Sequence, residues 1–308
     1  MKIRKWIVAC AAVLSLTMAM GLTGCSQPAQ PSPSTEPSAQ TSSAPSDEPS
    51  AEPSSPAASL SGSLNLGGST SVEKAVNGVL AEFIALNPNV TGKYDATGSS
   101  TGITNAQDGT YHIGFLSRAL KDEEKVDGLT SETFALDGIA AVVHPDNQVE
   151  KITTEQLMQI YTGEITNWKE LGGADAKIVV VSREEGSGTR DGFQELTGFE
   201  SEQLVKDCTI KDGNGNVATY VAGEKNAIGY VSFLTLEENA SALKGLPVND
   251  VEPTVDNVKN STYPLFRPFV LAYMDANLND AEKAYVEFIM SEEGQDIIVE
   301  NGAISVSK

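Results

Sequence analysis

The chain has 308 residues, and 42 acidic residues against 21 basic ones give it a formal net charge of −21. Such a chain is a poor nucleic-acid ligand, because it offers no basic patch that could release counterions from phosphates. With three cysteines and two histidines, it also has few ligands for a metal site based on either residue type. We therefore expect no cofactor and a fold stabilised by core packing.

The N-terminal segment has the pattern of a targeting signal. Basic residues at positions 2, 4 and 5 precede an apolar run over residues 7–20, which is too short to span a bilayer. Residues 22–25 read Leu-Thr-Gly-Cys and resemble the lipobox of bacterial lipoproteins. We expect residues 1–24 to be a signal peptide and Cys25 to carry a lipid. The alternative is an ordinary secretory signal with an incidental cysteine.

A segment of different composition follows the signal. Residues 26–59 hold eight of the chain's 14 prolines and no lysine, arginine or aromatic residue. Such a segment cannot bury enough apolar surface to offset its chain entropy. We expect residues 25–61 to be a disordered tether that holds the folded part at the outer face of the cell membrane.

From residue 62 onward, β-branched runs alternate with helical patterns, which is typical of α/β proteins. Strands are predicted at residues 63–66, 111–115, 139–143, 178–181, 227–233 and 269–274. Helices are predicted at residues 71–86, 154–161, 190–197 and 280–290.

Three glycine-rich junctions precede helices, at residues 67–71, 98–102 and 186–189. Each combines glycine with hydroxyl residues suited to helix N-caps, and Thr70 and Glu73 have the spacing of a capping box. The junctions can be helix caps and nothing more. If the three N-termini converge, their free N–H groups would bind an anion. Additional donors would come from the hydroxyls of Thr70, Ser71, Ser99, Ser187 and Thr189.

Arg183 lies at the end of a predicted strand, four residues before Ser187. A guanidinium there can form a bidentate pair with an oxyanion. The alternative is a surface arginine paired with Glu184 or Glu185. Both interpretations can hold if Glu185 orients the guanidinium toward a ligand.

Residues 183–189, Arg-Glu-Glu-Gly-Ser-Gly-Thr, closely resemble the R-x-x-G-S-G-T signature of the PstS-type phosphate-binding proteins of ABC importers. Five further blocks of this sequence resemble other blocks of that family, in the same order: residues 68–71, 98–100, 160–168, 227–230 and 263–268. The resemblance covers nearly all of residues 62–308. It implies a two-lobed periplasmic-binding-protein fold of type II, in which each lobe is a mostly parallel sheet flanked by helices and the ligand lies between the lobes.

The resemblance also implies a set of ligand contacts. By this reasoning phosphate is bound by Thr70, Ser71, Ser99, Arg183, Ser187, Gly188 and Thr189. Many family members have an aspartate directly after an I-G-x-x stretch. In this chain, Ser117 and Arg118 follow that stretch instead, as in Gram-positive members. We expect Ser117 to contribute a hydroxyl. Arg118 either adds a second positive group or pairs with Asp122 or Glu123. Two aromatic residues, Tyr161 and Trp168, are predicted to be packing residues of the second lobe.

A carboxylate that accepts a hydrogen bond from protonated phosphate would reject sulfate, which has no proton to donate. Our candidate is Asp137, a charged residue flanked by apolar ones at the expected crossing between lobes. The alternative is that Asp137 caps a turn. We expect crossings near residues 137–138 and 255–256. Lobe one would then be residues 62–137 plus 257–308, and lobe two residues 138–256.

The function implied by the resemblance is capture of inorganic phosphate and its delivery to the permease subunits of an ABC importer, by a monomer. Catalysis is not expected, because the turn at Ser187 is not G-x-S-x-G and neither histidine is an evident base. One alternative is a binding protein for another oxyanion, such as sulfate or molybdate. Another is a phosphate sensor or surface protein without a transporter.

Overall fold

A computed structural model describes residues 59–306; the predicted signal peptide, Cys25 and nearly all of the predicted tether lie outside these residues. The strands are β1 (Gly62–Gly68), β2 (Val90–Ala96), β3 (Ile113–Leu116), β4 (Leu129–Val143), β5 (Val179–Arg183), β6 (Thr209–Lys211), β7 (Ala227–Ser232), β8 (Lys244–Gly245), β9 (Phe266–Met274) and β10 (Ile304–Ser305). The α-helices are α1 (Glu73–Leu86), α2 (Ser99–Asp108), α3 (Thr154–Thr162), α4 (Gly188–Thr197), α5 (Gly213–Gly223), α6 (Phe233–Glu238), α7 (Val255–Lys259), α8 (Asp280–Met290) and α9 (Glu292–Glu300).

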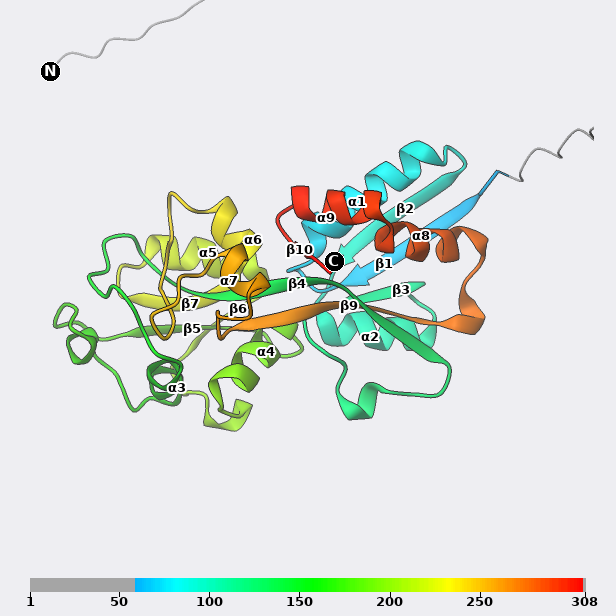
Figure 1. Cartoon of the computed structure of the whole chain (residues 1–308). Helices are drawn as coiled ribbons and strands as arrows, with labels where there is room; N and C mark the ends of the chain where they lie inside the picture. The colour runs from blue at the N-terminus through cyan, green and yellow to red at the C-terminus, as the bar shows by residue number, and fades with distance from the viewer. Residues whose placement is uncertain (1–58, 307–308) are drawn as a thin grey trace, which may run out of the picture. The chain divides into compact units, whose positions relative to one another are not determined.

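Two long strands, β4 and β9, pair antiparallel and run between two groups of elements (Figure 1). At one end, β3 continues the sheet, and β3, β1 and β2 are parallel to one another. At the other end, β7 pairs with β4, and β7, β5 and β6 are parallel. The α/β prediction is confirmed. The sheets are parallel only in their outer strands, because the strands shared by both groups pair antiparallel.

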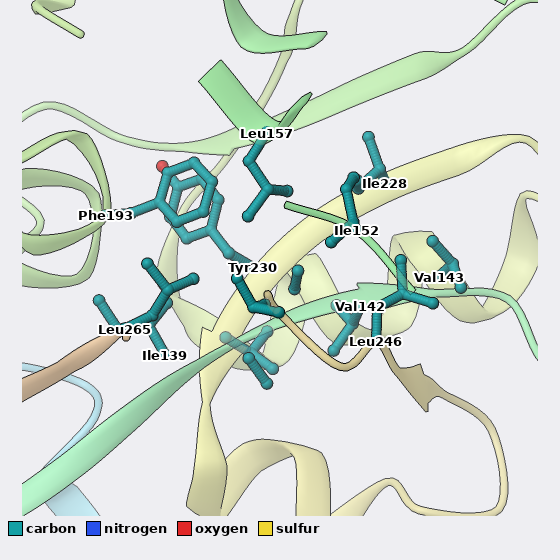
Figure 2. Packing of buried hydrophobic residues seen from close by; sticks show 14 of the residues in the cluster. Ile139, Val142, Val143, Ile152, Leu157, Phe193, Ile228, Tyr230, Leu246 and Leu265 are labelled. Atoms are coloured by element: carbon teal, nitrogen blue, oxygen red, sulfur yellow. The ribbon is translucent and has the colours of Figure 1, made fainter. Parts of the chain in front are cut away.

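Each group of elements has its own hydrophobic core. The first core includes Leu66, Phe115 and Phe269, and the elements around it are here called the first lobe. The second core includes Phe193 and Tyr230 (Figure 2), and its elements are called the second lobe. Strand β4 belongs to the first core up to residue 135 and to the second from residue 139. This change lies close to the crossing predicted at residues 137–138.

The chain returns to the first lobe later than predicted. Val258, Tyr263 and Leu265 all pack in the second core, whereas Phe269 packs in the first. The return therefore runs along β9, after residue 265, and not near residues 255–256. Helix α7 and the segment after it stay on the second lobe, where the Tyr263 hydroxyl donates to the carbonyl of Ile139 at 2.9 Å.

Aromatic packing in the second core fixes the position of helix α4. The rings of Phe193 and Tyr230 (Figure 2) stack with their centroids 4.1 Å apart. The ring of Tyr161 meets that of Phe193 edge-on. The Tyr161 hydroxyl donates to the carbonyl of Val181, and the Trp168 indole N–H donates to that of Asn226. The packing roles predicted for Tyr161 and Trp168 are confirmed. This packing holds the start of α4 next to the end of β5.

Each strand and helix predicted from the sequence is present, with ends shifted by a few residues in most cases. Strands β2, β6, β8 and β10, the first half of β4, and helices α5, α6, α7 and α9 were not predicted. Within residues 59–306, no helix has both the length and the apolar character needed to cross a membrane.

Strand β3 and helix α2 pack so closely that only glycine fits at position 114. A Cβ atom there would lie 2.8 Å from the carbonyl carbon of Gly102 and 3.0 Å from Cβ of Ala106. We predict that Gly114→Ala lowers the free energy of unfolding by about 1–3 kcal/mol, because the backbones must separate. Denaturant unfolding followed by circular dichroism measures this loss.

The matched control is Gly215→Ala on the exposed face of α5, where an added Cβ meets no atom within 4 Å. This variant should be as stable as the wild type or more stable by up to about 1 kcal/mol, because alanine favours the helix. Equal stability of the two variants would show that the β3–α2 contact is not close.

Candidate functional site

The hydroxyl groups between β1 and α1 do not cap helix α1. The helix begins at Glu73, and no side chain bonds its N-terminal N–H groups, so the predicted capping box is wrong. Ser69 Oγ instead accepts from the N–H of Ser71 at 3.1 Å and donates to Ser117 Oγ at 2.8 Å. Ser69 thus bonds within the first lobe, whereas the hydroxyls of Thr70 and Ser71 have partners on the second lobe.

The second junction also directs its hydroxyl inward. Ser99 is the first residue of α2, and its Oγ accepts from the N–H of Ser117 at 3.1 Å. The two hydroxyl oxygens of Ser99 and Ser117 lie 3.4 Å apart. The next N–H, that of Ser100, donates to the carbonyl of Gly186 at 3.1 Å. The second and third junctions are therefore in direct contact.

The third junction does cap its helix. Ser187 Oγ accepts from the N–H of Arg190 in the first turn of α4, at 3.3 Å. Two residues later, Thr189 Oγ1 lies 2.8 Å from Ser71 Oγ of the first lobe. Between them, a Cβ atom at Gly188 would lie 2.7 Å from Ser117 Oγ. Glycine is needed here because the lobes meet at this residue.

The three junctions converge, as the sequence predicted. We call the hydroxyl residues that bond one another here, together with Thr70, the hydroxyl cluster. Its members are Ser69, Thr70, Ser71, Ser99, Ser117 and Thr189. All but Thr70 are almost completely buried, and both lobes contribute. Gly188 contacts the cluster directly. Ser187 lies between Gly188 and Gly186, whose carbonyl accepts from the N–H of Ser100.

Arg183 projects into this region from the end of β5. Its Nη2 donates to Thr70 Oγ1 at 3.2 Å, and its Nε and Nη2 bond the two carboxylate oxygens of Glu184 at 2.7 and 2.6 Å. Of the two acidic partners considered from the sequence, Arg183 pairs with Glu184 and not with the exposed Glu185, and it is buried and not a surface arginine. Burial opposes ionisation of Glu184, yet the bonds from Arg183 outweigh it and lower the pKa of this carboxyl. The side chain of Arg183 is 1% exposed, and its Nη1 has no hydrogen-bond partner.

Asn214, in the first turn of α5, was not predicted as a site residue. Its Nδ2 donates to Thr70 Oγ1 at 3.1 Å and to Ser71 Oγ at 2.9 Å. Its Oδ1 accepts from the N–H of Ser232 at 3.2 Å. Residues 212–215, Asp-Gly-Asn-Gly, form another glycine-rich junction before a helix, which could have drawn attention to Asn214.

Arg267 of β9 was also missed. This side chain is nearly completely buried; its Nη2 donates to Ser71 Oγ at 3.0 Å and its Nη1 to Ser117 Oγ at 3.3 Å. Nε and Nη2 also donate to Asp137 Oδ2, at 3.2 and 2.8 Å. An arginine between apolar residues 265 and 269 is a signal that could have found it.

Asp137 lies inside strand β4, directly opposite Arg267 in the register, so the turn-cap interpretation is wrong. Besides Arg267, its carboxylate accepts from the N–H of Phe233 at 3.2 Å. Burial raises the pKa of Asp137 to about 6, although Arg267 opposes this shift. Burial likewise lowers the pKa of Arg267. In this geometry Asp137 supports Arg267, and Arg267 reaches the hydroxyl cluster.

The hydrogen bonds of Arg118 go to residues outside the hydroxyl cluster. It pairs with Glu124 at 2.6 Å and with Asp191 of α4 at 2.8 Å, and not with Asp122 or Glu123 as proposed from the sequence. Because Asp191 lies on the second lobe, Arg118 links the lobes at the edge of the site. Among the described residues, no group of three or more His, Cys, Asp or Glu side chains could hold a metal ion.

Residues 50–293 match the family model described as a PBP superfamily domain. The chain is 32% identical over 252 residues to the phosphate-binding protein PstS of Bacillus subtilis, covering 82% of it and 80% of this chain. It is 30% identical over 250 residues to PstS of Borreliella burgdorferi, covering 90% of that protein and 79% of this chain. The chain belongs to the PstS family of phosphate-binding proteins.

Solved structures agree with this membership. A substrate-binding protein of Clostridium perfringens, solved with bound phosphate, is 46% identical with a TM-score of 0.77, over 80% of this chain and all of that one. An ABC-type phosphate transport receptor of Vibrio cholerae is 33% identical with a TM-score of 0.68, over 78% of this chain and 99% of that one. The PstS-family fold is therefore shared along the whole described region.

The raised pKa of Asp137 predicts a pH dependence of stability. Its folded pKa, about 6, lies above the value of an unfolded aspartate, so the folded state holds a proton that the unfolded state releases. The stability that this extra proton gives the folded state is fully present below the unfolded pKa of Asp137. It is lost as the pH rises through the folded pKa. Between about pH 4 and pH 7, the wild type should lose about 2–3 kcal/mol of unfolding free energy relative to Asp137→Asn. Denaturant titrations of both proteins at several pH values measure this loss. If the difference in unfolding free energy between the two proteins did not change with pH, the pKa of Asp137 would not be raised.

Proposed function

We propose that this chain captures inorganic phosphate between its two lobes and delivers it to an ABC-type importer. The observation that carries the proposal is the unpartnered Nη1 of Arg183, a charged donor nearly completely buried beside the hydroxyl cluster. A buried cationic donor without a partner is costly unless a ligand satisfies it. A tetrahedral oxyanion supplies the acceptors that such a group and its neighbouring hydroxyls need.

Local donors must overcome the repulsion between a small anion and a chain of net charge −21. A micromolar dissociation constant corresponds to about 8 kcal/mol. Charge-assisted hydrogen bonds contribute about 1.5–3 kcal/mol each, so Arg183 and a few hydroxyl and backbone donors suffice after desolvation costs. The first turn of α4 adds N–H groups and the positive end of its helix dipole.

The relatives favour phosphate over other oxyanions. The Bacillus and Borreliella proteins are phosphate-binding proteins by name, and the Clostridium structure contains phosphate. We propose the same ligand here, bound by Thr70, Ser71, Ser99, Ser117, Arg183, Ser187, Gly188 and Thr189, with Asp137 holding Arg267 behind them.

Binding without catalysis follows from the same site. The hydroxyls of the cluster bond one another and arginine or amide donors, and no histidine lies among their hydrogen-bond partners in the described region. A hydroxyl nucleophile needs an adjacent base for activation. We therefore propose that the chain does not hydrolyse phosphate esters, and turnover of a chromogenic ester would overturn this part.

Arg183 is expected to dominate affinity. We predict that Arg183→Ala weakens phosphate binding by at least about 100-fold in calorimetry, because a charge-assisted contact is lost and Glu184 is left facing the anion. The control is Arg190→Ala, whose guanidinium donates to the carbonyl of Arg183 and not to the cluster. It should change the affinity by less than about tenfold. If the two variants bound phosphate equally well, Arg183 would not be the anion's partner.

We also propose that Cys25 carries a lipid and that residues 26–61 tether a monomer to the outer face of the cell membrane. The support is the resemblance of residues 22–25 to a lipobox and the composition of the segment after it. In a bacterial host, the wild type should sediment with membranes and Cys25→Ser should not. The matched control is Cys208→Ser, a half-buried cysteine of the folded part, which should stay with the membranes. Membrane retention of Cys25→Ser would exclude the anchor.

A further inference from the structure

The end of strand β5, which carries Arg183, has a strand partner on one side only. Within the described residues, the pairing of β5 with β7 covers Val179 and Val180 and stops there. On its other side, β5 pairs with β6, a strand of three residues at the edge of the sheet. A short edge strand has no neighbour beyond it to hold it in place. The backbone of Arg183 therefore depends on contacts other than strand pairing.

Two tyrosine hydroxyls supply hydrogen bonds to the backbone at this end of β5. The N–H of Arg183 donates to Tyr230 Oη at 3.2 Å, and the Tyr161 hydroxyl donates to the carbonyl of Val181 at 3.0 Å. Ser182 Oγ lies 2.6 Å from Tyr230 Oη. Both tyrosines are almost completely buried, so water cannot take the place of a hydroxyl that is removed.

The ring of Tyr230 is held in place by aromatic packing. It stacks on Phe193 with the two centroids 4.1 Å apart (Figure 2), and the centroid of the Tyr161 ring lies 5.6 Å away. Phe193 belongs to helix α4, which begins at Gly188 in the third glycine-rich junction. One side chain thus contacts both the strand that ends in Arg183 and the helix whose N-terminus faces the hydroxyl cluster.

The hydroxyl of Tyr230 is suited to accept a hydrogen bond permanently. Burial raises the pKa of Tyr230 to about 12, so the hydroxyl stays neutral at physiological pH. Arg190 also bonds Arg183, through the carbonyl at 3.3 Å, but its side chain is only half-buried and has more rotatable bonds than a tyrosine. The rigid side-chain contact to the backbone of Arg183 is therefore that of Tyr230.

We propose that Tyr230 is a positioning residue of the anion site: its hydroxyl holds the backbone of Arg183 and its ring holds α4, so that the guanidinium and the helix N-terminus face the same anion. This inference rests on the proposed phosphate site and adds to it a residue whose hydrogen bonds go to β5 and not to the hydroxyl cluster. Position matters because a guanidinium binds an oxyanion strongly only when its N–H groups point at the oxygens.

The first test is Tyr230→Phe, which keeps the stacked ring and removes the hydroxyl. Calorimetry with inorganic phosphate should give a dissociation constant at least about tenfold higher than that of the wild type, because the Arg183 N–H loses its partner and the guanidinium is less well aligned. The matched control is Tyr285→Phe, whose lost hydroxyl is also buried and donates to the carbonyl of Val76 in the first lobe. The control should bind phosphate within about threefold of the wild type.

A double-mutant cycle separates positioning from a general loss of packing. In the Arg183→Ala background, measured at millimolar phosphate, adding Tyr230→Phe should change the affinity by less than about threefold, because the guanidinium that Tyr230 positions is absent. A further tenfold loss in this background would show that the hydroxyl acts on the whole lobe, and the positioning role would be wrong.

Two other outcomes distinguish this inference from the proposed function. If the wild type binds phosphate and a folded Tyr230→Phe binds it equally well, the role of Tyr230 is overturned while phosphate capture stands. If the wild type itself does not bind phosphate, the proposed function fails and this inference fails with it.

Amide hydrogen exchange in the wild type tests the contact without any substitution. Because Tyr230 Oη accepts from it, the Arg183 N–H should exchange within about tenfold of the rate of the Val179 N–H, which donates to the carbonyl of Asn226. Exchange as fast as that of an exposed loop amide would contradict the inference, even if Tyr230→Phe did not fold.

Discussion

The pairing of Asp137 with Arg267 is the interaction on which the arrangement of the site depends. The two residues face each other across β4 and β9, the strands that both lobes share. Burial disfavours both charges, so the pair is a poor source of stability. Its value is geometric, because a guanidinium held at the point where the lobes meet can reach hydroxyls on either side. Because Arg267 donates to Ser71 and Ser117, it fixes these two hydroxyls of the cluster in place.

An acidic protein can bind an anion in this way because the relevant field is local. The hydroxyls of Thr70, Ser71 and Ser117 accept from the side chains of Arg183, Asn214 and Arg267. Each of these donors is held in turn by a carboxylate or a backbone group. Fixed dipoles in a buried site act more strongly than dispersed surface charge, which solvent and salt screen. The surplus of surface acids therefore has little effect on the bound anion.

Sequence reasoning was most successful where a local pattern was sufficient. Helix α1 shows clear apolar spacing, and the convergence of three glycine-rich junctions was predicted correctly. Strand β2 is polar and only partly buried, and α5 contains several glycines, so neither shows a strong periodic signal. Arg267 and Asn214 were missed because their roles depend on partners far away in the sequence. Asp137 stood out as a charge among apolar residues, but its role became clear only with Arg267 opposite it.

The ion pairs of Asp191 with Arg118 and Lys121 join the lobes at the rim, outside the hydroxyl cluster. Lys121 is well exposed there, so ionic strength weakens its contact while the buried bonds are little affected. Among variants of one interface, most changes in affinity appear in the dissociation rate and not in the association rate. Substitutions along the rim can thus adjust residence time, which an importer must match to its own cycle, without altering which anion is chosen.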